Sequence, residues 1–392
     1  MADRSHPHTA PVYVVGGGPG GLATAAALGE RGVRAVVLER SDAVGASWRR
    51  TYDHLRLHTT RRLSGLPGLP IPRSCGRWVS RDDLVGYLER YTEHHGLDVV
   101  TGVEVSRVDR AEDGSGWLLH ATGGRRLSSP AVVVATGLHH TPLLPEWPGA
   151  DGFTGELRHA ADYRAPDPYR DRDVLVVGAG STGTEIAVAL AGAGAARVRL
   201  AVRTVPHLVR RSAAGCSAQR AAVLTRRLPR RAADRAARTL NRALLPDLSG
   251  YGLPRPATGP YTGHRTGAGP VPEAGLAAAV AAGRVEIVPA VESFEGGAVV
   301  LADGSRIGPE AVIAATGYRC ALDGLVGHLG VLDEHGHPLV HGPRTLGSAP
   351  GLHFTGFSRP VSGTLRELGL DARRIARALA HRPAPARPAP AR

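Results

Sequence analysis

Two stretches of the chain share one order of hydrophobic and polar positions. Each begins with a short apolar run, passes through a glycine-rich turn into an alanine-rich helical stretch, and ends in a second apolar run. The stretches are residues 12–40, VYVVGGGPGGLATAAALGERGVRAVVLER, and residues 174–203, VLVVGAGSTGTEIAVALAGAGAARVRLAVR. Short apolar runs bounded by turn residues are typical of buried strands in a parallel sheet. The pattern therefore predicts an α/β fold with an internal repeat of two strand-turn-helix-strand units.

Both units place the pattern G-x-G-x-x-G directly after the first strand. Its first glycine allows the tight turn, its second lets the backbone approach a pyrophosphate, and its third lets the helix pack closely on the strand. The helix amino terminus then offers unpaired N–H groups to the phosphates. One such pattern could be an ordinary tight turn, but two copies in the full context predict two Rossmann-like dinucleotide sites. The glycines are Gly16, Gly18 and Gly21, and Gly178, Gly180 and Gly183.

The residue near the end of each second strand distinguishes the two ligands. Glu39 lies 18 positions after Gly21, where a carboxylate can accept hydrogen bonds from the ribose hydroxyls of FAD or NAD. Arg203 lies 20 positions after Gly183, where a guanidinium can pair with the 2′-phosphate of NADPH. The first unit therefore suits FAD or NAD, and the second suits NADPH.

Composition adds little to this picture. The formal charge of +13 comes from arginine alone, because the 392-residue chain contains no lysine, so the charge is weak evidence for a polyanionic partner. Aromatic residues make up 4%, which argues against base stacking on nucleic acid. The three cysteines lie far apart, so neither a redox disulfide nor a metal site is expected. With no signal-like amino terminus and no long apolar stretch, we expect a cytoplasmic protein without membrane contact.

The segment FTGELRHAADYR, residues 153–164, lies between the two glycine turns and matches the pattern F-x-G-x-x-x-H-x-x-x-Y. This pattern resembles the fingerprint of class B flavoprotein monooxygenases, and tyrosine at its last position favours the flavin-containing monooxygenase branch. Residues 51–59, TYDHLRLHT, together with GLPRPATGP and GLHFTGF, are similar to the YUCCA-like members. The resemblance spans about residues 12–380. The matched positions are Phe153, Gly155, His159 and Tyr163.

The resemblance implies an NADPH-dependent, FAD-containing monooxygenase. In this family NADPH reduces FAD, oxygen adds at the flavin C4a position, and the resulting (hydro)peroxide transfers one oxygen atom to a substrate. The substrate expected here is a small soluble molecule, either a 2-oxo acid that is decarboxylated or an amine or sulfur compound. No nucleic acid partner is expected, and homodimer formation is left open.

The implied organisation is an FAD domain interrupted by an NADPH domain. We expect residues 1–165 and 306–382 to form the FAD domain and residues 166–305 to form the NADPH domain, which carries a basic helical or loop insertion at about 206–272. Residues 383–392 have the composition of a disordered tail. The similar segments AVVVATG and AVIAATG are expected to end strands where the chain crosses between domains.

The resemblance also implies site residues. His58 is expected beside the flavin, and His159 and Tyr163 are expected to link the two dinucleotide domains near the cofactors; these three form the candidate catalytic set. Residues expected to contact cofactors are Gly16, Gly18, Gly20, Gly21, Glu39, Arg40, Trp48, His58, Val105, Ala135, Thr136, Gly137, Gly178, Gly180, Ser181, Thr182, Gly183, Arg203, Thr204, Thr316, Gly317, Tyr318, Gly356 and Phe357.

Two other functions remain to be distinguished. An NADPH-dependent flavoprotein reductase would pass electrons to a protein or quinone and would turn over without oxygen; the fingerprint segment argues against it. Phe357, where FAD-dependent disulfide reductases carry aspartate, argues against that class. A non-enzymatic protein could instead use the basic residues 209–242 to bind nucleic acid or an acidic membrane, although a solvated helix explains these arginines better.

Overall fold

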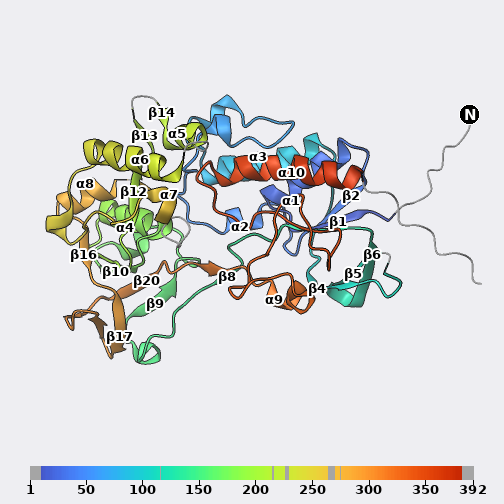
Figure 1. Ribbon diagram of the computed structural model, residues 1–392. Coiled ribbons are helices and arrows are strands. Elements are labelled where there is room, and N and C mark those ends of the chain that lie inside the picture. The colour runs from blue at the N-terminus through green and yellow to red at the C-terminus, as the bar shows by residue number, and fades with distance from the viewer. Residues whose placement is uncertain are drawn as a thin grey trace, which may run out of the picture. The chain divides into compact units, whose positions relative to one another are not determined.

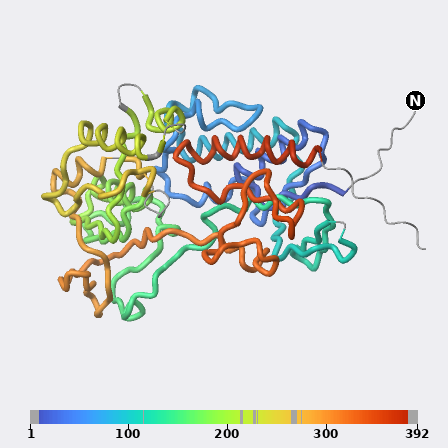
Figure 2. Tube along the Cα trace, in the orientation of Figure 1, coloured from blue at the N-terminus to red at the C-terminus, as the bar shows by residue number. Residues whose placement is uncertain are grey.

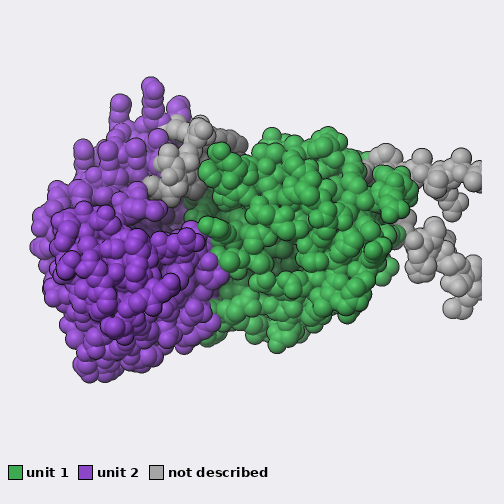
Figure 3. Space-filling model, turned by 90° about the horizontal axis from the view of Figure 1, so that it is seen from below, with its two compact units in different colours: residues 1–50, 61–141, 319–392 green, residues 51–60, 142–318 purple. Residues whose placement is uncertain are grey.

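The computed structural model describes residues 10–114, 116–213, 216–225, 229–263, 270–273 and 275–381. The chain divides into two compact units, shown in green and purple in Figure 3. Unit 1 comprises residues 1–50, 61–141 and 319–392, and unit 2 comprises residues 51–60 and 142–318. The expected tail at 383–392 lies outside the described residues, as do parts of the basic stretch at 206–272.

Unit 1 is built on a five-stranded parallel sheet with the order β22-β7-β1-β2-β3. Three of these strands consist almost entirely of buried valine and leucine, as a sheet covered on both faces requires. Helices α1 and α10, blue and red in Figure 2, lie side by side. The bounds are β1 Val12–Val15, β2 Ala35–Leu38, β3 Asp98–Val100, β7 Val132–Val134, β22 Leu352–Phe354, α1 Pro19–Gly29 and α10 Thr364–Ala380.

Unit 2 repeats this plan with the sheet β16-β11-β10-β20-β9, again parallel (Figure 1). Helix α4 follows β10 as α1 follows β1. Its buried residues Ile186 and Leu190 pack in one core with the strand residues Val174 and Leu200. The bounds are β9 Glu156–His159, β10 Asp173–Val177, β11 Arg197–Ala201, β16 Glu286–Val288, β20 Ala311–Ala314, α4 Ser181–Ala193 and α8 Leu276–Ala281. The predicted α/β fold with two Rossmann-like units is confirmed.

Smaller elements complete each unit. Unit 1 adds the antiparallel sheet β4-β5-β6, and unit 2 adds the antiparallel sheet β17-β18-β19 and two short pairs of strands, β12-β15 and β13-β14. Unit 1 contains β4 Val105–Arg110, β5 Trp117–Ala121, β6 Arg125–Ser129, α2 Ala46–Arg49, α3 Arg81–His94 and α9 Asp323–Val326. Unit 2 contains β12 His207–Arg210, β13 Ser212–Ala213, β14 Cys216–Ser217, β15 Pro270–Glu273, β17 Val291–Glu295, β18 Ala298–Leu301, β19 Arg306–Ile307, α5 Ala218–Thr225, α6 Arg230–Leu244 and α7 Pro260–Gly263. Strands β8 Thr141–Pro142 and β21 Tyr318–Arg319 lie where the chain passes between units.

The boundaries of the two compact units differ from those expected for the FAD and NADPH domains. Their boundaries fall at 50/51, 60/61, 141/142 and 318/319, whereas the expected domains change at 165/166 and 305/306. The difference has a physical reason, because β9 and β20 hydrogen-bond into the sheet that contains β10. Residues 51–60 likewise belong to unit 2. Among the described residues, no helix combines the length and apolar character needed to cross a membrane.

Candidate functional site

The glycine turn of unit 1 leaves no room for side chains where the chain is tightest. A Cβ on Gly16, whose φ is +114°, would lie 2.6 Å from the carbonyl oxygen of Ala135. A Cβ on Gly21 would lie 1.9 Å from the carbonyl oxygen of Gly16. Gly18 differs, because a Cβ there meets nothing within 4 Å. Two glycines therefore serve the fold, and the third leaves open space at the amino terminus of α1, where a phosphate fits.

Glu39 follows β2 and turns a buried carboxylate back toward this turn. Its Oε2 accepts a hydrogen bond of 2.7 Å from the N–H of Gly17, and its Oε1 accepts one of 2.9 Å from the N–H of Ser41. Each carboxylate oxygen can accept a second hydrogen bond, so a pair of ribose hydroxyls matches the remaining acceptors.

Two hydroxyl groups of unit 1 are buried without a partner. Thr136 follows β7 and Thr355 follows β22, and their Oγ1 atoms make no hydrogen bond to any described residue. Beside them, Gly137 and Gly356 both have positive φ, and a Cβ on Gly356 would lie 4.0 Å from the Cα of Gly137. Unpaired buried hydroxyls are costly unless a ligand or water satisfies them. These groups, the open space at Gly18 and the Glu39 carboxylate fit FAD.

Other residues expected at the FAD site have different surroundings. Gly20 faces Leu368 of α10, 3.0 Å from where its Cβ would lie, and Phe357 is buried against Phe354, so both pack within the unit. Arg40 lies 2.8 Å from the Nε2 of His140. Trp48 is half-buried on α2, and Val105 is half-buried at the start of β4.

The glycine turn of unit 2 repeats the first one closely. A Cβ on Gly178 would lie 2.6 Å from the carbonyl oxygen of Ala315, and a Cβ on Gly183 would lie 1.8 Å from the carbonyl oxygen of Gly178. Gly180 again has open space, and no side chain caps the amino terminus of α4, where Ser181 and Thr182 begin the helix. The turn of unit 2 therefore offers the same open space at a helix amino terminus as the turn of unit 1.

Strand register places different residues after the second strand of each unit. Val15 pairs with Leu38 in the first sheet, and Val177 pairs with Ala201 in the second, so Val202 occupies the position of Glu39 and Arg203 that of Arg40. An apolar residue thus replaces the ribose-binding carboxylate. Arg203 and Thr204 are exposed, and the Arg203 guanidinium makes no ion pair within the described part of the chain. This combination fits the 2′-phosphate of NADPH.

The middle of the segment 153–164 forms a strand at the edge of the second sheet. Glu156–His159 forms the edge strand β9, in which His159 pairs with Ala314 of β20. A Cβ on Gly155 would lie 2.7 Å from the ring of Phe153 and 2.9 Å from the carbonyl oxygen of Glu310, so a side chain would push this strand away. Two fingerprint positions, Gly155 and His159, therefore lie where β9 pairs with β20.

His159 is held by the backbone through both ring nitrogens. Its Nε2 lies 3.0 Å from the carbonyl oxygen of Gly317, and its Nδ1 accepts from the N–H of Ala161 at 3.0 Å. Burial lowers the pKa of His159 more than the Gly317 hydrogen bond and nearby Asp162 raise it. A neutral ring with both nitrogens engaged suits positioning of the turn at Gly317.

The same turn carries the other expected residues of this part of the chain. The Thr316 hydroxyl donates to the carbonyl oxygen of Leu143 at 2.5 Å, and the N–H of Leu143 donates to Gly317 at 2.9 Å. The ring of Tyr318 meets that of His159 edge to face at 5.0 Å between centroids. Like Ala135 to Gly137 in unit 1, these residues lie beside the glycine turn of their own unit.

Tyr163 closes the fingerprint in a buried aromatic cluster. Its side chain is 1% exposed, and its hydroxyl makes no hydrogen bond to a described residue. The ring lies 6.1 Å from that of Tyr52, 5.9 Å from that of His54 and 6.0 Å from that of Tyr169. Burial raises the pKa of Tyr163 well above its ordinary value, so the phenol stays protonated. Tyr163 thus packs on residues 51–60.

His58 also lies in unit 2, on the segment 51–60. Its Nε2 is 2.7 Å from Oε1 of Glu185, a buried carboxylate on α4, and Tyr52 donates its hydroxyl to Oε2 of the same residue at 2.7 Å. Glu185 lies two residues after Gly183, so the structure brings His58 next to the beginning of α4. Glu185 was not predicted as a site residue, although a carboxylate within the otherwise apolar run EIAVAL is a visible signal in the sequence.

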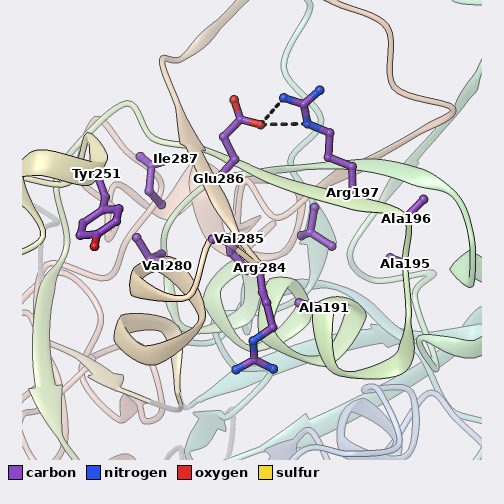
Figure 4. A pocket seen from close by; sticks show the side chains of 12 residues that line it. Ala191, Ala195, Ala196, Arg197, Tyr251, Val280, Arg284, Val285, Glu286 and Ile287 are labelled. Carbon is purple, nitrogen blue, oxygen red and sulfur yellow. Dashed lines mark hydrogen bonds and ion pairs between the residues drawn. The ribbon is translucent and has the colours of Figure 1, made fainter.

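A cavity of about 610 Å³ lies elsewhere in unit 2. Figure 4 shows its lining side chains, including Tyr251, Val280, and the ion pair between Arg197 and Glu286. Arg197 and Glu286 begin β11 and β16, whereas the glycine turn follows the carboxyl end of β10. Because dinucleotides bind at the carboxyl ends of parallel strands, this cavity is not the cofactor site.

Known proteins are similar to this chain over most of its length. Residues 13–217 match the model of the pyridine nucleotide-disulphide oxidoreductase family. Indole-3-pyruvate monooxygenase YUCCA1 of Oryza sativa subsp. japonica is 34% identical over 356 residues, which cover 90% of this chain and 87% of the relative. The probable indole-3-pyruvate monooxygenase YUCCA9 of Arabidopsis thaliana is 34% identical over 355 residues, covering 88% and 84%. The structure of a flavin monooxygenase variant from Stenotrophomonas maltophilia matches with a TM-score of 0.74 and 25% identity, covering 95% of this chain and 98% of that one.

Proposed function

Because this chain belongs to the flavin-containing monooxygenase family, in its YUCCA-like branch, we propose that its substrate is a 2-oxo acid, with indole-3-pyruvate as the first compound to test. The chain is an NADPH- and FAD-dependent monooxygenase that transfers one oxygen atom from O₂ to a small molecule. The observation that carries the substrate proposal is the 34% identity to indole-3-pyruvate monooxygenase YUCCA1 across 90% of this chain.

The proposed overall reaction is an oxidative decarboxylation. A 2-oxo acid, O₂, NADPH and a proton give the carboxylic acid that is one carbon shorter, CO₂, NADP⁺ and water. The bond between the carboxylate carbon and the keto carbon breaks, and one oxygen atom joins the former keto carbon. The other oxygen atom leaves as water, with both electrons supplied by NADPH.

The chain's own residues bind and orient the reactants. When bound, NADPH supplies the electrons, and FAD carries them and provides the centre at which O₂ is activated. We infer that Glu39 holds a ribose of FAD and that Thr136 and Thr355 offer hydroxyls to it. Arg203 would pair with the 2′-phosphate of NADPH, and the amino terminus of α4 would face its pyrophosphate.

Three residues are proposed to support the reaction without forming an acid-base dyad. His159 would position the turn at Gly317, Tyr163 would pack the segment 51–60, and His58 would face the reacting groups with one ring nitrogen held. Neutral His159 and protonated Tyr163 offer no charged base, in agreement with a reaction whose protein contribution is orientation and exclusion of water.

The decisive experiment supplies purified, FAD-loaded protein with NADPH and ¹⁸O₂. With indole-3-pyruvate we expect CO₂ release, NADPH oxidation in equal amount, and a shortened acid carrying one ¹⁸O atom by mass spectrometry. A thioether and a tertiary amine serve as comparison substrates. Faster labelling of either comparison compound would replace the 2-oxo acid, and NADPH oxidation by a quinone without oxygen would favour a reductase.

We also propose that the protein works in the cytoplasm and does not bind nucleic acid. All three cysteines, Cys75, Cys216 and Cys320, are free thiols, which supports a reducing compartment. Fractionation of the native host would test the compartment, and a gel shift at low salt would test DNA binding. Light scattering of the protein as it elutes from a size-exclusion column would decide between a monomer and the homodimer that the sequence leaves open.

A further inference from the structure

We propose that Glu185 is a positioning residue for oxygenation, which holds the segment 51–60 and its His58 against the first two turns of α4. The inference rests on the monooxygenase function but not on the choice of a 2-oxo acid as substrate. Glu185 would act through His58 and Tyr52, without touching the substrate itself.

The geometry of Glu185 is that of an anchor. Its side chain is 6% exposed and accepts three hydrogen bonds of 2.7 Å: His58 and Arg211 donate to Oε1, and Tyr52 donates to Oε2. A buried carboxylate is stable only when such donors replace its water. Because His58 and Tyr52 come from one segment and Glu185 from α4, the carboxylate joins the two.

Further contacts fasten the same segment within unit 2. The N–H of Asp53 donates to the carbonyl oxygen of Arg164 at 2.9 Å, directly after the fingerprint. The N–H of Thr60 donates to the side-chain oxygen of Gln219 on α5 at 3.1 Å. These bonds hold Asp53 and Thr60, whereas Glu185 holds His58, which lies between them, and Tyr52, which precedes Asp53. Loss of Glu185 would therefore release His58 while leaving Asp53 and Thr60 attached.

The charges around Glu185 favour its ionised form. Burial raises the pKa of the Glu185 carboxyl, but the hydrogen bonds from His58 and Tyr52 and the positive charges of His58 and Arg211 outweigh burial, so its pKa lies below the ordinary value. Burial and the Glu185 charge both raise the pKa of Tyr52, which keeps the phenol as a donor. His54, whose ring lies 4.7 Å from that of Tyr52, has its pKa lowered by burial despite the nearby Glu185 and Asp53 charges.

The arrangement leaves His58 with one committed ring nitrogen. Its Nε2 faces Glu185, while its Nδ1 makes no hydrogen bond to another described residue, and the side chain is 30% exposed. A carboxylate that holds one imidazole nitrogen sets the tautomer and the direction of the ring. Glu185 thus determines which His58 nitrogen is available to a ligand.

The test compares Glu185→Gln with Asp173→Asn in the full-length, FAD-loaded enzyme. Asp173 makes a comparable ion pair with buried Arg199 at 2.5 Å, but at the amino end of β10, away from the glycine turn. With any substrate that the wild-type enzyme oxygenates, we expect Glu185→Gln to lower kcat about tenfold and to raise the H₂O₂ released per NADPH. The KM for NADPH should change less than about twofold, because Arg203 and the glycine turn are intact.

A second measurement requires neither cofactor nor substrate. Arg56 is exposed in the middle of the segment, so trypsin cleavage after it, followed by mass spectrometry of the cofactor-free protein, reports release of the segment. We expect faster cleavage there in Glu185→Gln and wild-type cleavage in Asp173→Asn. Tyr52→Phe is the substitute variant if Glu185→Gln does not fold. It removes one hydrogen bond and no charge, so it should speed cleavage after Arg56 by a smaller amount.

A double-mutant cycle then separates positioning from general stability. If Glu185 acts through His58, His58→Gln should lower kcat much less in the Glu185→Gln background than in the wild type. It should likewise add less to the H₂O₂ released per NADPH in that background. Additive effects of the two substitutions would overturn the proposal. So would wild-type coupling and wild-type Arg56 cleavage in Glu185→Gln. Failure to oxygenate a 2-oxo acid would overturn only the substrate proposal, since the trypsin result is independent of it.

Discussion

The Nε2 of His159 donates a hydrogen bond of 3.0 Å to the carbonyl oxygen of Gly317, 158 positions further along the chain. The N–H of Ala161 donates to the opposite ring nitrogen at 3.0 Å, so His159 is neutral, with its proton on Nε2. Gly317 also accepts from the N–H of Leu143. The fingerprint histidine therefore secures the turn that follows β20, beside the glycine turn of unit 2.

The pH dependence of stability should reflect this neutral ring. Burial lowers the folded-state pKa of His159 below its ordinary 6.5, so its contribution to stability is present above pH 6.5 and is lost as pH falls through the folded pKa. Gln at this position can donate to Gly317 but cannot titrate. We expect His159→Gln to cost about 1 kcal/mol at about pH 7.5, with a smaller difference from wild type at about pH 5.5, measured by urea unfolding. A difference that grows on acidification would contradict a neutral His159.

The repeat and its cofactor assignments could be predicted from sequence because they depend on local rules. Glycines at fixed spacing, a carboxylate after one strand and an arginine after the other are visible in a single βαβ unit. The edge strand β9 was not predicted, because its residues Glu156–His159 are polar and pair with β20 from far along the chain. The pairing of Ala311–Ala314 with β10 was not predicted either, because these residues are also far apart in the chain, and the domain change expected at 305/306 stays a prediction.

The cluster around His58 shows a second limit. His58 is expected beside the flavin from the resemblance alone, and that expectation stays a prediction. Its partner Glu185 is 127 positions away, and Arg211 reaches the same carboxylate from a third segment. Hydrogen bonds between side chains so distant in sequence depend on packing that no local pattern encodes.

Gly180 and Gly183 should respond oppositely to alanine. A Cβ on Gly180 meets nothing within 4 Å, whereas a Cβ on Gly183 would overlap the Gly178 carbonyl oxygen at 1.8 Å. We expect Gly180→Ala to keep the wild-type Tm within about 2 °C while weakening NADPH binding about tenfold or more, because the methyl group occupies the space for the pyrophosphate. Gly183→Ala should lower the Tm strongly or fail to fold. Calorimetry measures NADPH binding. Unchanged binding by Gly180→Ala would show that the pyrophosphate does not bind at this turn.

Glu39 should determine how well FAD is retained. Both its oxygens accept from backbone N–H groups, and an amide at this place would turn a donor toward one of them. We expect Glu39→Gln to raise the Kd for FAD about tenfold, measured by flavin fluorescence during reconstitution, while Glu112→Gln in an exposed loop leaves it unchanged. Equal retention of FAD by both variants would remove Glu39 from the site.

Arg203 should determine the preference for NADPH over NADH. It is exposed, and Val202 replaces the ribose-binding carboxylate beside it, so the 2′-phosphate is the feature that it can recognise. Arg203→Glu replaces attraction by repulsion, and we expect it to raise the KM for NADPH about 100-fold while changing the KM for NADH less than about twofold. Arg238→Gln, which removes an exposed arginine from α6, is the matched control and should leave both KM values unchanged. Steady-state oxidation of each cofactor gives the four values, and an equal loss with NADPH and NADH in Arg203→Glu would show that Arg203 does not contact the 2′-phosphate.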